Sequence, residues 1–276
     1  MPSPLYIDRL GQAVLLAGLL SLNCAAQQPE SPSLNDILVR MQANLSDYLH
    51  NVPNFFCDER VDSRLQQPGA SEQKTVTDSI FRLRRSVTPT DEWQFSESRE
   101  IKTVNKQVAK GEDIQGPAIF SGAFTNAAAV VSLELSHCYD YNLIPDARLG
   151  KSPVLLVEFA TQESAIGDKS CPTSERETGR AWIDPNNFHL LRVEARIPNH
   201  EAVDGILALW TWEIEYAPVT FDSRQFWMPK TIASKAEAND NRAVWSFTAN
   251  YRNYHKLTVT SHIITDVDKN PPSPPQ

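Results

Sequence analysis

Glycine is scarce in this chain, with 10 copies among 276 residues. Neither of the glycine-rich phosphate loops, GxGxxG and GxxxxGK(S/T), occurs, so the sequence carries no nucleotide-binding fingerprint. Lysine and arginine number 26 against 34 aspartates and glutamates, which gives a formal net charge of -8. Because binding to phosphate groups needs clustered cations, this balance argues against nucleic acid or an anionic membrane surface as the main partner.

Apolar runs of membrane-spanning length are lacking as well. The run Ala13–Leu22 has 10 residues, whereas a bilayer about 30 Å thick needs roughly 20. Arg9 precedes this run, and Cys24–Ala26 offers small residues before a cleavage site at Gln27. We therefore interpret residues 1–26 as a secretory signal peptide, with a retained anchor or a lipidated cysteine as alternatives. The mature protein is expected to be soluble and exported, to the periplasm or beyond the cell.

Cysteine is rare, with 4 copies, and one of them leaves with the signal peptide. In an oxidising compartment two of the remaining three are expected to pair. We favour Cys138 with Cys171, a strand-like site with a polar loop, and expect about 3–4 kcal/mol of stabilisation. Cys57 is then a buried free thiol, and the neighbouring Asp58 and Glu59 disfavour a reactive thiolate. No two cysteines have the CxxC spacing of a zinc site.

One amphipathic helix is predicted after a polar linker at 27–32. Ser33 is the expected N-cap, and Pro53 ends the helix. Its apolar residues recur at helical spacing and share one face. They are Leu34, Ile37, Leu38, Met41, Leu45, Tyr48 and Leu49.

Beyond Pro53 the apolar period changes to two, which is typical of antiparallel strands with one buried and one wet face. Alternation is clearest over 206–217 and 243–254. The segment 110–132 breaks the pattern and suggests a short helix or a mobile flap. We predict a single β domain over 33–268 and a disordered, proline-rich tail over 269–276. The predicted strands are 54–64, 75–85, 92–104, 134–143, 153–161, 178–184, 187–197, 206–217, 227–236, 243–254 and 257–266, with turns at 184–187 and 253–256.

A local motif adds a family resemblance to this order of elements. Gly179–Pro185 forms a hairpin that runs into Phe188–Glu194, and Glu215–Val219 and Phe226–Lys230 follow. These segments resemble the LolA/LolB-like superfamily of outer-membrane lipoprotein-sorting carriers. The resemblance implies an α+β, mostly antiparallel β fold, a strongly curved incomplete barrel with an N-terminal helix and a mid-chain helical segment over its concave face. It also implies an apolar cavity that binds acyl chains.

Aromatic side chains are the candidate ligand-binding residues. All the tryptophans fall in predicted strands. Aromatic rings that carry a hydrogen-bonding group suit a cavity that is apolar inside and solvated at its rim. The alternative is that they only fill a barrel core. The candidates are Trp93, Phe95, Trp182, Trp210, Trp212, Trp227, Trp245 and Phe247.

Signals for catalysis or metal binding are weak. The 6 histidines form no HExxH pair, and no GxSxG elbow marks a nucleophile. Glu213 and Glu215 share a strand face, but that face is expected to be solvated. The sequence therefore predicts no catalytic residue, no metal and no cofactor.

Three functions follow, in order of preference. The first is an exported protein that binds a lipid or a lipidated protein without catalysis. The second is a cell-envelope interaction or scaffold module with a filled core. The third is a hydrolase whose catalytic residues lie far apart in the sequence.

Overall fold

The computed structural model describes residues 31–66, 69–87, 93–109, 122–125, 127–173, 175–201, 207–238 and 244–258. The predicted signal peptide (1–26), the tail (269–276) and most of the predicted strand 257–266 lie outside these residues. The elements follow in chain order: α1 (Leu34–Asn51), β1 (Phe55–Gln66), β2 (Gln73–Val87), β3 (Trp93–Val104), β4 (Gln107–Val108), η1 (Ala127–Val131), β5 (Tyr139–Ile144), β6 (Arg148–Leu149), β7 (Ser152–Pro153), β8 (Leu155–Thr161), η2 (Glu163–Ala165), β9 (Thr178–Ile183), β10 (Leu190–Glu201), β11 (Leu207–Phe221), β12 (Arg224–Ala238) and β13 (Val244–Lys256).

The strands build an 11-stranded antiparallel sheet in the order β4-β3-β2-β1-β13-β12-β11-β10-β9-β8-β5. Most neighbours in the sheet are also neighbours along the chain, as hairpin connections require. There are two exceptions. β5 pairs with β8, with β6 and β7 between them in the chain, and β1 pairs with β13, where Phe55 lies opposite Lys256. This pairing places the last strand beside the first. The short strands β6 and β7 form a separate pair.

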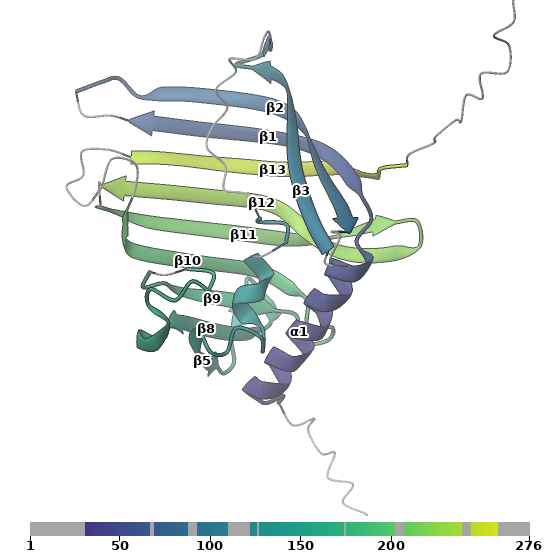
Figure 1. The fold of residues 1–276 in the computed structure, drawn as a ribbon, viewed down its shortest axis with the longest axis vertical. Helices are drawn as coiled ribbons and strands as arrows, with labels where there is room; N and C mark the ends of the chain where they lie inside the picture. Colours follow the sequence, from purple (N-terminus) through teal and green to yellow (C-terminus); the bar gives the residue numbers. More distant parts are fainter. Residues whose placement is uncertain are drawn as a thin grey trace, which may run out of the picture. The chain divides into compact units, whose positions relative to one another are not determined.

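The sheet is strongly curved and stays open. Figure 1 shows β3 running steeply across the direction of β1 and β13, while α1 crosses one face of the sheet. Since β4 and β5 form free edges, the barrel is incomplete. The predicted fold class, α+β with a curved antiparallel half-barrel, is confirmed.

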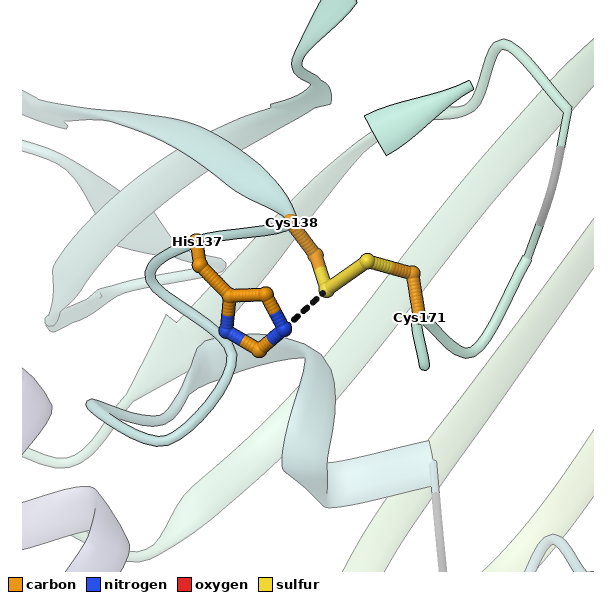
Figure 2. A group of neighbouring side chains, drawn as sticks. All are labelled: His137, Cys138 and Cys171. Carbon is orange, nitrogen blue, oxygen red and sulfur yellow. Dashed lines mark hydrogen bonds between the residues drawn. A yellow bond between two sulfur atoms is a disulfide. The ribbon is translucent and has the colours of Figure 1, made fainter. Parts of the chain in front are cut away.

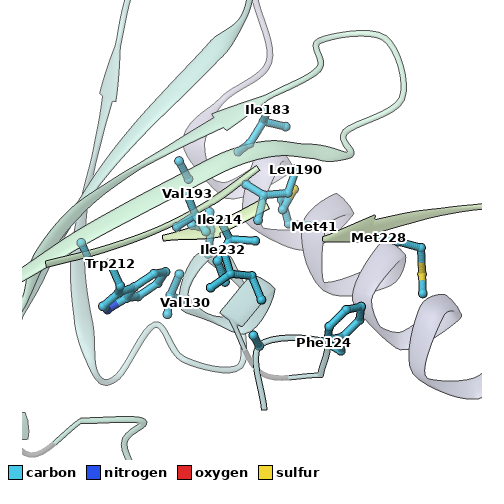
Figure 3. Close-up of a cluster of buried hydrophobic side chains, with 14 of the residues drawn as sticks. Met41, Phe124, Val130, Ile183, Leu190, Val193, Trp212, Ile214, Met228 and Ile232 are labelled. Carbon is cyan, nitrogen blue, oxygen red and sulfur yellow. The ribbon is translucent and has the colours of Figure 1, made fainter. Parts of the chain in front are cut away.

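Alternation along the strands explains which face is buried. In β1 the residues from Phe55 to Val61 are buried at every second position, and in β11 Ala208, Trp212 and Ile214 point inward. Helix α1 adds its apolar stripe to the same core. Figure 3 shows Met41 of α1 among side chains of the sheet, including Leu190 and Ile214.

The helix begins and ends close to where the sequence predicts. Ser33 and Asp36 form a capping box, in which the Asp36 N–H donates to the Ser33 hydroxyl at 3.2 Å. Ile37, Leu38, Met41 and Leu45 are buried. None of the helices in the described part combines the length and apolar character that crossing a membrane requires.

Two predicted boundaries differ from the structure. Residues 253–256 continue β13 and do not form a turn, because they pair with the start of β1. The predicted strand 134–143 begins only at Tyr139. The residues before it form turns, held by the Cys138 N–H donating to the Leu135 carbonyl at 2.9 Å.

Candidate functional site: a small cavity beneath the helix

A cavity of about 70 Å³ lies between α1, the segment around Phe124, the β9–β10 turn and the β11–β12 hairpin. Its walls are mostly apolar. The apolar lining residues are Met41, Leu45, Ala123, Phe124, Ala128, Phe188, Leu190, Phe226 and Pro229.

Three hydrogen-bond donors in the cavity lining have no partner. The hydroxyls of Tyr48 and Tyr216 and the indole Nε1–H of Trp227 are buried and unpaired, and all three residues line the cavity. Among the described residues only two other buried side-chain polar atoms share this condition. An unpaired buried donor costs about 1–3 kcal/mol. Three such donors in one place indicate that a group outside the described residues satisfies them.

Burial and nearby negative charge set the ionisation of the two phenols. Burial raises the pKa of Tyr216. Burial also raises the pKa of Tyr48, and the charges of Tyr216 and Glu97 raise it further. Both phenols are therefore neutral at physiological pH and offer O–H donors.

The described residues that line the cavity include no lysine or arginine. Asp47 lies at its rim and pairs with Arg224 of β12 through two contacts of 2.5 and 2.6 Å. His189 stacks on Trp227 with ring centroids 5.2 Å apart, and burial lowers its pKa. The described lining of the cavity therefore offers hydrogen-bond donors but no lysine or arginine.

Polar contacts at the rim hold α1 over the cavity. Asn44 donates to the carbonyls of Asn187 and Phe188 at 3.0 and 2.8 Å. Both carbonyls belong to the β9–β10 turn, in which Phe188 has a φ of 58°. The Asp47–Arg224 pair is largely exposed, so it is worth little by itself. Most of the helix attachment thus comes from its buried apolar stripe.

The segment 122–125 closes the cavity from a second side. Glu97 of β3 accepts the Gly122 N–H at 3.0 Å. Phe124 stacks on Phe81 at 4.5 Å and meets the edge of Tyr251 at 5.0 Å. Burial raises the pKa of Glu97, while Arg99 opposes the shift. A carboxylate and an aromatic cluster therefore fix this segment to the sheet.

Of the aromatic residues predicted to bind a ligand, Trp227 lines this cavity. Trp210 donates to the Ser234 hydroxyl at 2.8 Å, and Trp212 donates to the buried Glu177 carboxylate at 3.1 Å. Trp182 lies on the face of the sheet opposite the cavity, with the Arg192 guanidinium carbon 5.1 Å from the centroid of its ring.

The remaining candidates lie elsewhere on the sheet. Trp245 and Phe247 stack with centroids 6.3 Å apart, and Phe95 packs against the core while half-buried. The side chain of Trp93 lies outside the described residues. The structure thus distributes the candidates over several strands, and their role in binding stays a prediction.

The sequence reasoning missed Tyr48 and Tyr216 as site residues. Both were part of apolar patterns, Tyr48 in the helix stripe and Tyr216 at an inward strand position. A hydroxyl on an otherwise apolar face is the signal that marks them. Their convergence depends on how α1 lies on the sheet, and no spacing in the sequence encodes it.

A second, larger hollow of about 860 Å³ lies on the outer face of the sheet. Its lining alternates between outward-facing polar side chains and the buried residues between them. Ion pairs cross it, such as Arg180 with Glu158 at 3.0 Å. Arg192 joins Glu194 and Glu213 next to it, at 3.0 and 2.7 Å. Trp212 and Phe247, two of the residues predicted to bind a ligand, are among its lining residues.

The predicted disulfide is confirmed. Cys138 and Cys171 are bonded, with an S–S distance of 2.08 Å and Cα atoms 5.7 Å apart. Figure 2 shows the His137 ring beside the bond, with its Nε2 3.3 Å from the Cys138 sulfur. This is the one group in the described residues with metal-ligand spacing, but its sulfurs are bonded to each other and are not thiolates. Cys57 is free and buried, as predicted, and burial raises the pKa of its thiol.

A carboxylate, a sulfur and a hydroxyl each lie beside a histidine, but each beside a different one. His200 Nδ1 lies 2.8 Å from the Glu175 carboxylate. A different histidine, His137, lies beside the disulfide sulfur of Cys138. A third, His50, lies beside the Ser46 hydroxyl. In the described part of the chain these pairs do not assemble into an acid–histidine–nucleophile triad.

The fold and the site together define a class: an open antiparallel half-barrel with a helix across its inner face and a small apolar cavity beneath that helix. Neither a protein-family model nor a curated protein matches the sequence. Among solved structures, a LolA superfamily protein from Nitrosomonas europaea is similar, at 12% identity and a TM-score of 0.34, over 83% of this chain and 96% of the other. A DUF1329 family protein from Desulfovibrio piger is similar at 10% identity and a TM-score of 0.38, over 83% and 93%. The assignment to the class comes from the strand order and the position of the helix.

Proposed function

We propose that this protein is an exported, non-catalytic carrier that binds an apolar ligand, a lipid or the lipid of a lipidated protein, beneath α1. The supporting observation is the apolar cavity between α1 and the inner face of the sheet, with unpaired donors in its lining. Clefts with apolar walls and a few polar groups are the usual form of small-molecule sites.

The size of the cavity implies that binding requires movement. Ligand cavities usually measure about 300–1,000 Å³, far above the present 70 Å³. Ile37, Leu38, Met41 and Leu45 each contribute about 1.5–3 kcal/mol by burial. Lifting the helix into water therefore costs roughly 6–12 kcal/mol. A ligand that replaces these contacts removes most of that cost, so the apolar chain itself drives the opening.

The test is binding of a neutral apolar dye, N-phenyl-1-naphthylamine, whose fluorescence rises in an apolar site. We expect the dye to bind and to be displaced by long-chain lipids. A helix lock shows where it binds: the double variant Asp47→Cys with Arg224→Cys, joined by a short bismaleimide, should lose binding because α1 cannot lift. The matched control is Glu163→Cys with Arg176→Cys, another exposed ion pair remote from the cavity. Equal binding by both crosslinked proteins would rule out the site beneath the helix.

The small volume of the cavity also favours one alternative, an interaction module with a filled core. In that case the helix lock leaves partner binding unchanged and lipid extracts of the purified protein contain no bound species. Export is tested separately, by mass spectrometry of the N-terminus. A mature chain that begins at Gln27 supports the signal peptide at 1–26.

A further inference from the structure

We infer that the reduced form of this protein binds a zinc ion through His137 Nε2 and the sulfurs of Cys138 and Cys171. None of these three residues lines the cavity beneath α1, so the inference goes beyond the proposed function and does not depend on it. It rests on the geometry of one imidazole ring beside the disulfide.

The three ligand atoms already lie together. His137 Nε2 and the sulfurs of Cys138 and Cys171 are all within 4.8 Å of one another. Figure 2 shows Nε2 facing the Cys138 sulfur, 3.3 Å away. From the lengths of zinc–sulfur and zinc–nitrogen bonds, neighbouring ligand atoms of a tetrahedral zinc site lie about 3.5–3.8 Å apart. The imidazole therefore stands close to the separation that two zinc ligands keep.

The other nitrogen of His137 is held as in a zinc ligand. Nδ1 lies 3.0 Å from the Glu134 carbonyl oxygen. Because a carbonyl oxygen can only accept, Nδ1 carries the proton of the neutral ring and Nε2 keeps a lone pair for a metal. Histidines that bind metals almost always donate their second ring N–H in this way, to a carbonyl, a carboxylate or water. The backbone around residue 134 thus selects the tautomer that can bind zinc.

The site is open on one side. His137 is exposed and Cys171 is half-buried, while Cys138 is buried directly before β5. Asp168, in the same loop as Cys171, interacts electrostatically with His137, and its negative charge favours a cation there. Water takes the fourth position of the tetrahedron from the exposed side.

A two-electron reduction creates the site. A thiolate of a dithiol reductant attacks the half-buried Cys171 sulfur, and Cys138 leaves as a thiolate. The second thiolate of the reductant then attacks the mixed disulfide and releases Cys171, so that the reductant becomes the disulfide. Zinc binds both sulfurs as thiolates, and any protons on them pass to water. The oxidised form offers no thiolate, so zinc binds only the reduced form.

The experiment is titration with Co²⁺, a spectroscopic substitute for zinc. The full chain is used as isolated, and again after reduction by dithiothreitol that is removed without oxygen. We expect the reduced protein to bind one Co²⁺ with a thiolate-to-cobalt charge-transfer band in the ultraviolet, which Zn²⁺ abolishes. The oxidised protein should show no such band.

Variants test whether the imidazole is a ligand. Reduced His137→Gln should bind Co²⁺ at least about tenfold more weakly than wild type. His50→Gln is the matched control, because His50 is also exposed, with Nδ1 beside a backbone carbonyl, and it should bind like wild type. Cys57→Ala should keep the band, since that cysteine is not part of the group.

A further check needs no variant. In the reduced wild type, Zn²⁺ should slow the alkylation of Cys171 by iodoacetamide, because a thiolate bound to zinc is no longer a free nucleophile. Circular dichroism follows the fold of each sample.

Four outcomes overturn the inference. They are a reduced wild type without the charge-transfer band, a reduced chain that unfolds even with Co²⁺ present, loss of the band in Cys57→Ala, and His137→Gln that binds as tightly as wild type. None of them alters the binding of the dye beneath α1, so the proposed function is tested separately.

Discussion

Removing one phenol hydroxyl should lower stability at Tyr139 but not at Tyr216. Tyr139 is buried and Tyr216 is partly buried with its hydroxyl shielded from water, and burial raises the pKa of each phenol. They differ in hydrogen bonding. The Tyr216 hydroxyl has no partner, whereas the Tyr139 hydroxyl donates to the Glu177 carboxylate at 2.8 Å. Substitution by phenylalanine is the same chemical change at both sites, so any difference reports the environment.

The magnitudes follow from these contacts. Glu177 is 4% exposed and receives hydrogen bonds from Tyr139 and Trp212. Tyr139→Phe leaves this carboxylate with one donor fewer, which should lower the free energy of unfolding by about 1.5–3 kcal/mol. Tyr216→Phe removes a hydroxyl whose burial is uncompensated. It should leave the free energy of unfolding unchanged or raise it by up to about 1 kcal/mol.

Urea unfolding followed by circular dichroism measures both changes. The comparison requires oxidising buffer, so that the disulfide is intact, and equal denaturant slopes for the variants. A loss of stability in Tyr216→Phe as large as that in Tyr139→Phe would refute the reasoning. It would mean that the Tyr216 hydroxyl has a partner, such as an ordered water, and the cavity would then hold no unmet donor at that position.

Further predictions concern the disulfide, the buried carboxylate and one glycine. Cys171→Ala opens a loop with a sequence separation of 33 and should lower the free energy of unfolding in urea by about 3–4 kcal/mol. A variant as stable as wild type in the same buffer would contradict the entropic account. Burial raises the pKa of Glu177 above its ordinary 4.5, so folding favours the protonated form. The stability of wild type relative to Glu177→Gln should therefore fall as pH rises from about 4.5 through the raised pKa, and a constant difference between about pH 4 and pH 8 would contradict it. At Gly179 an added Cβ would lie 2.4 Å from the Glu194 carbonyl oxygen and 2.2 Å from the Phe159 ring. Gly179→Ala should thus lower the free energy of unfolding by at least about 1–3 kcal/mol. A thermal midpoint equal to that of wild type would show that the sheet relaxes around the added methyl group.

The attachment of α1 bears on the proposed binding of a ligand. Helix α1 is attached mainly by apolar contacts, while the polar links at Asn44 and Asp47 lie at the rim. In the proposed function, an apolar ligand would compete directly with the helix stripe for the same surface of the sheet. Changes in that stripe should therefore alter ligand affinity and protein stability in opposite directions.

Local patterns in the sequence determined the elements. Helical spacing of apolar residues with Ser33 and Asp36 at the start defined α1, and the period of two defined the long strands, including the inward side of β11. These features depend on contacts between residues close in the chain and on the simple rule that one face is buried. The pairing of Cys138 with Cys171 followed from their setting and the expected oxidising compartment.

Tertiary structure alone decided where the site lies. Tyr48, Tyr216 and Trp227 come from α1, β11 and β12, and only the curvature of the sheet and the position of the helix bring their donors into one cavity. It also decided that Glu59 and Glu177 point inward, where Arg99 and the Tyr139–Trp212 pair satisfy them. A buried charge is tolerated only when a partner from a distant strand reaches it, and the sequence by itself does not contain that distance.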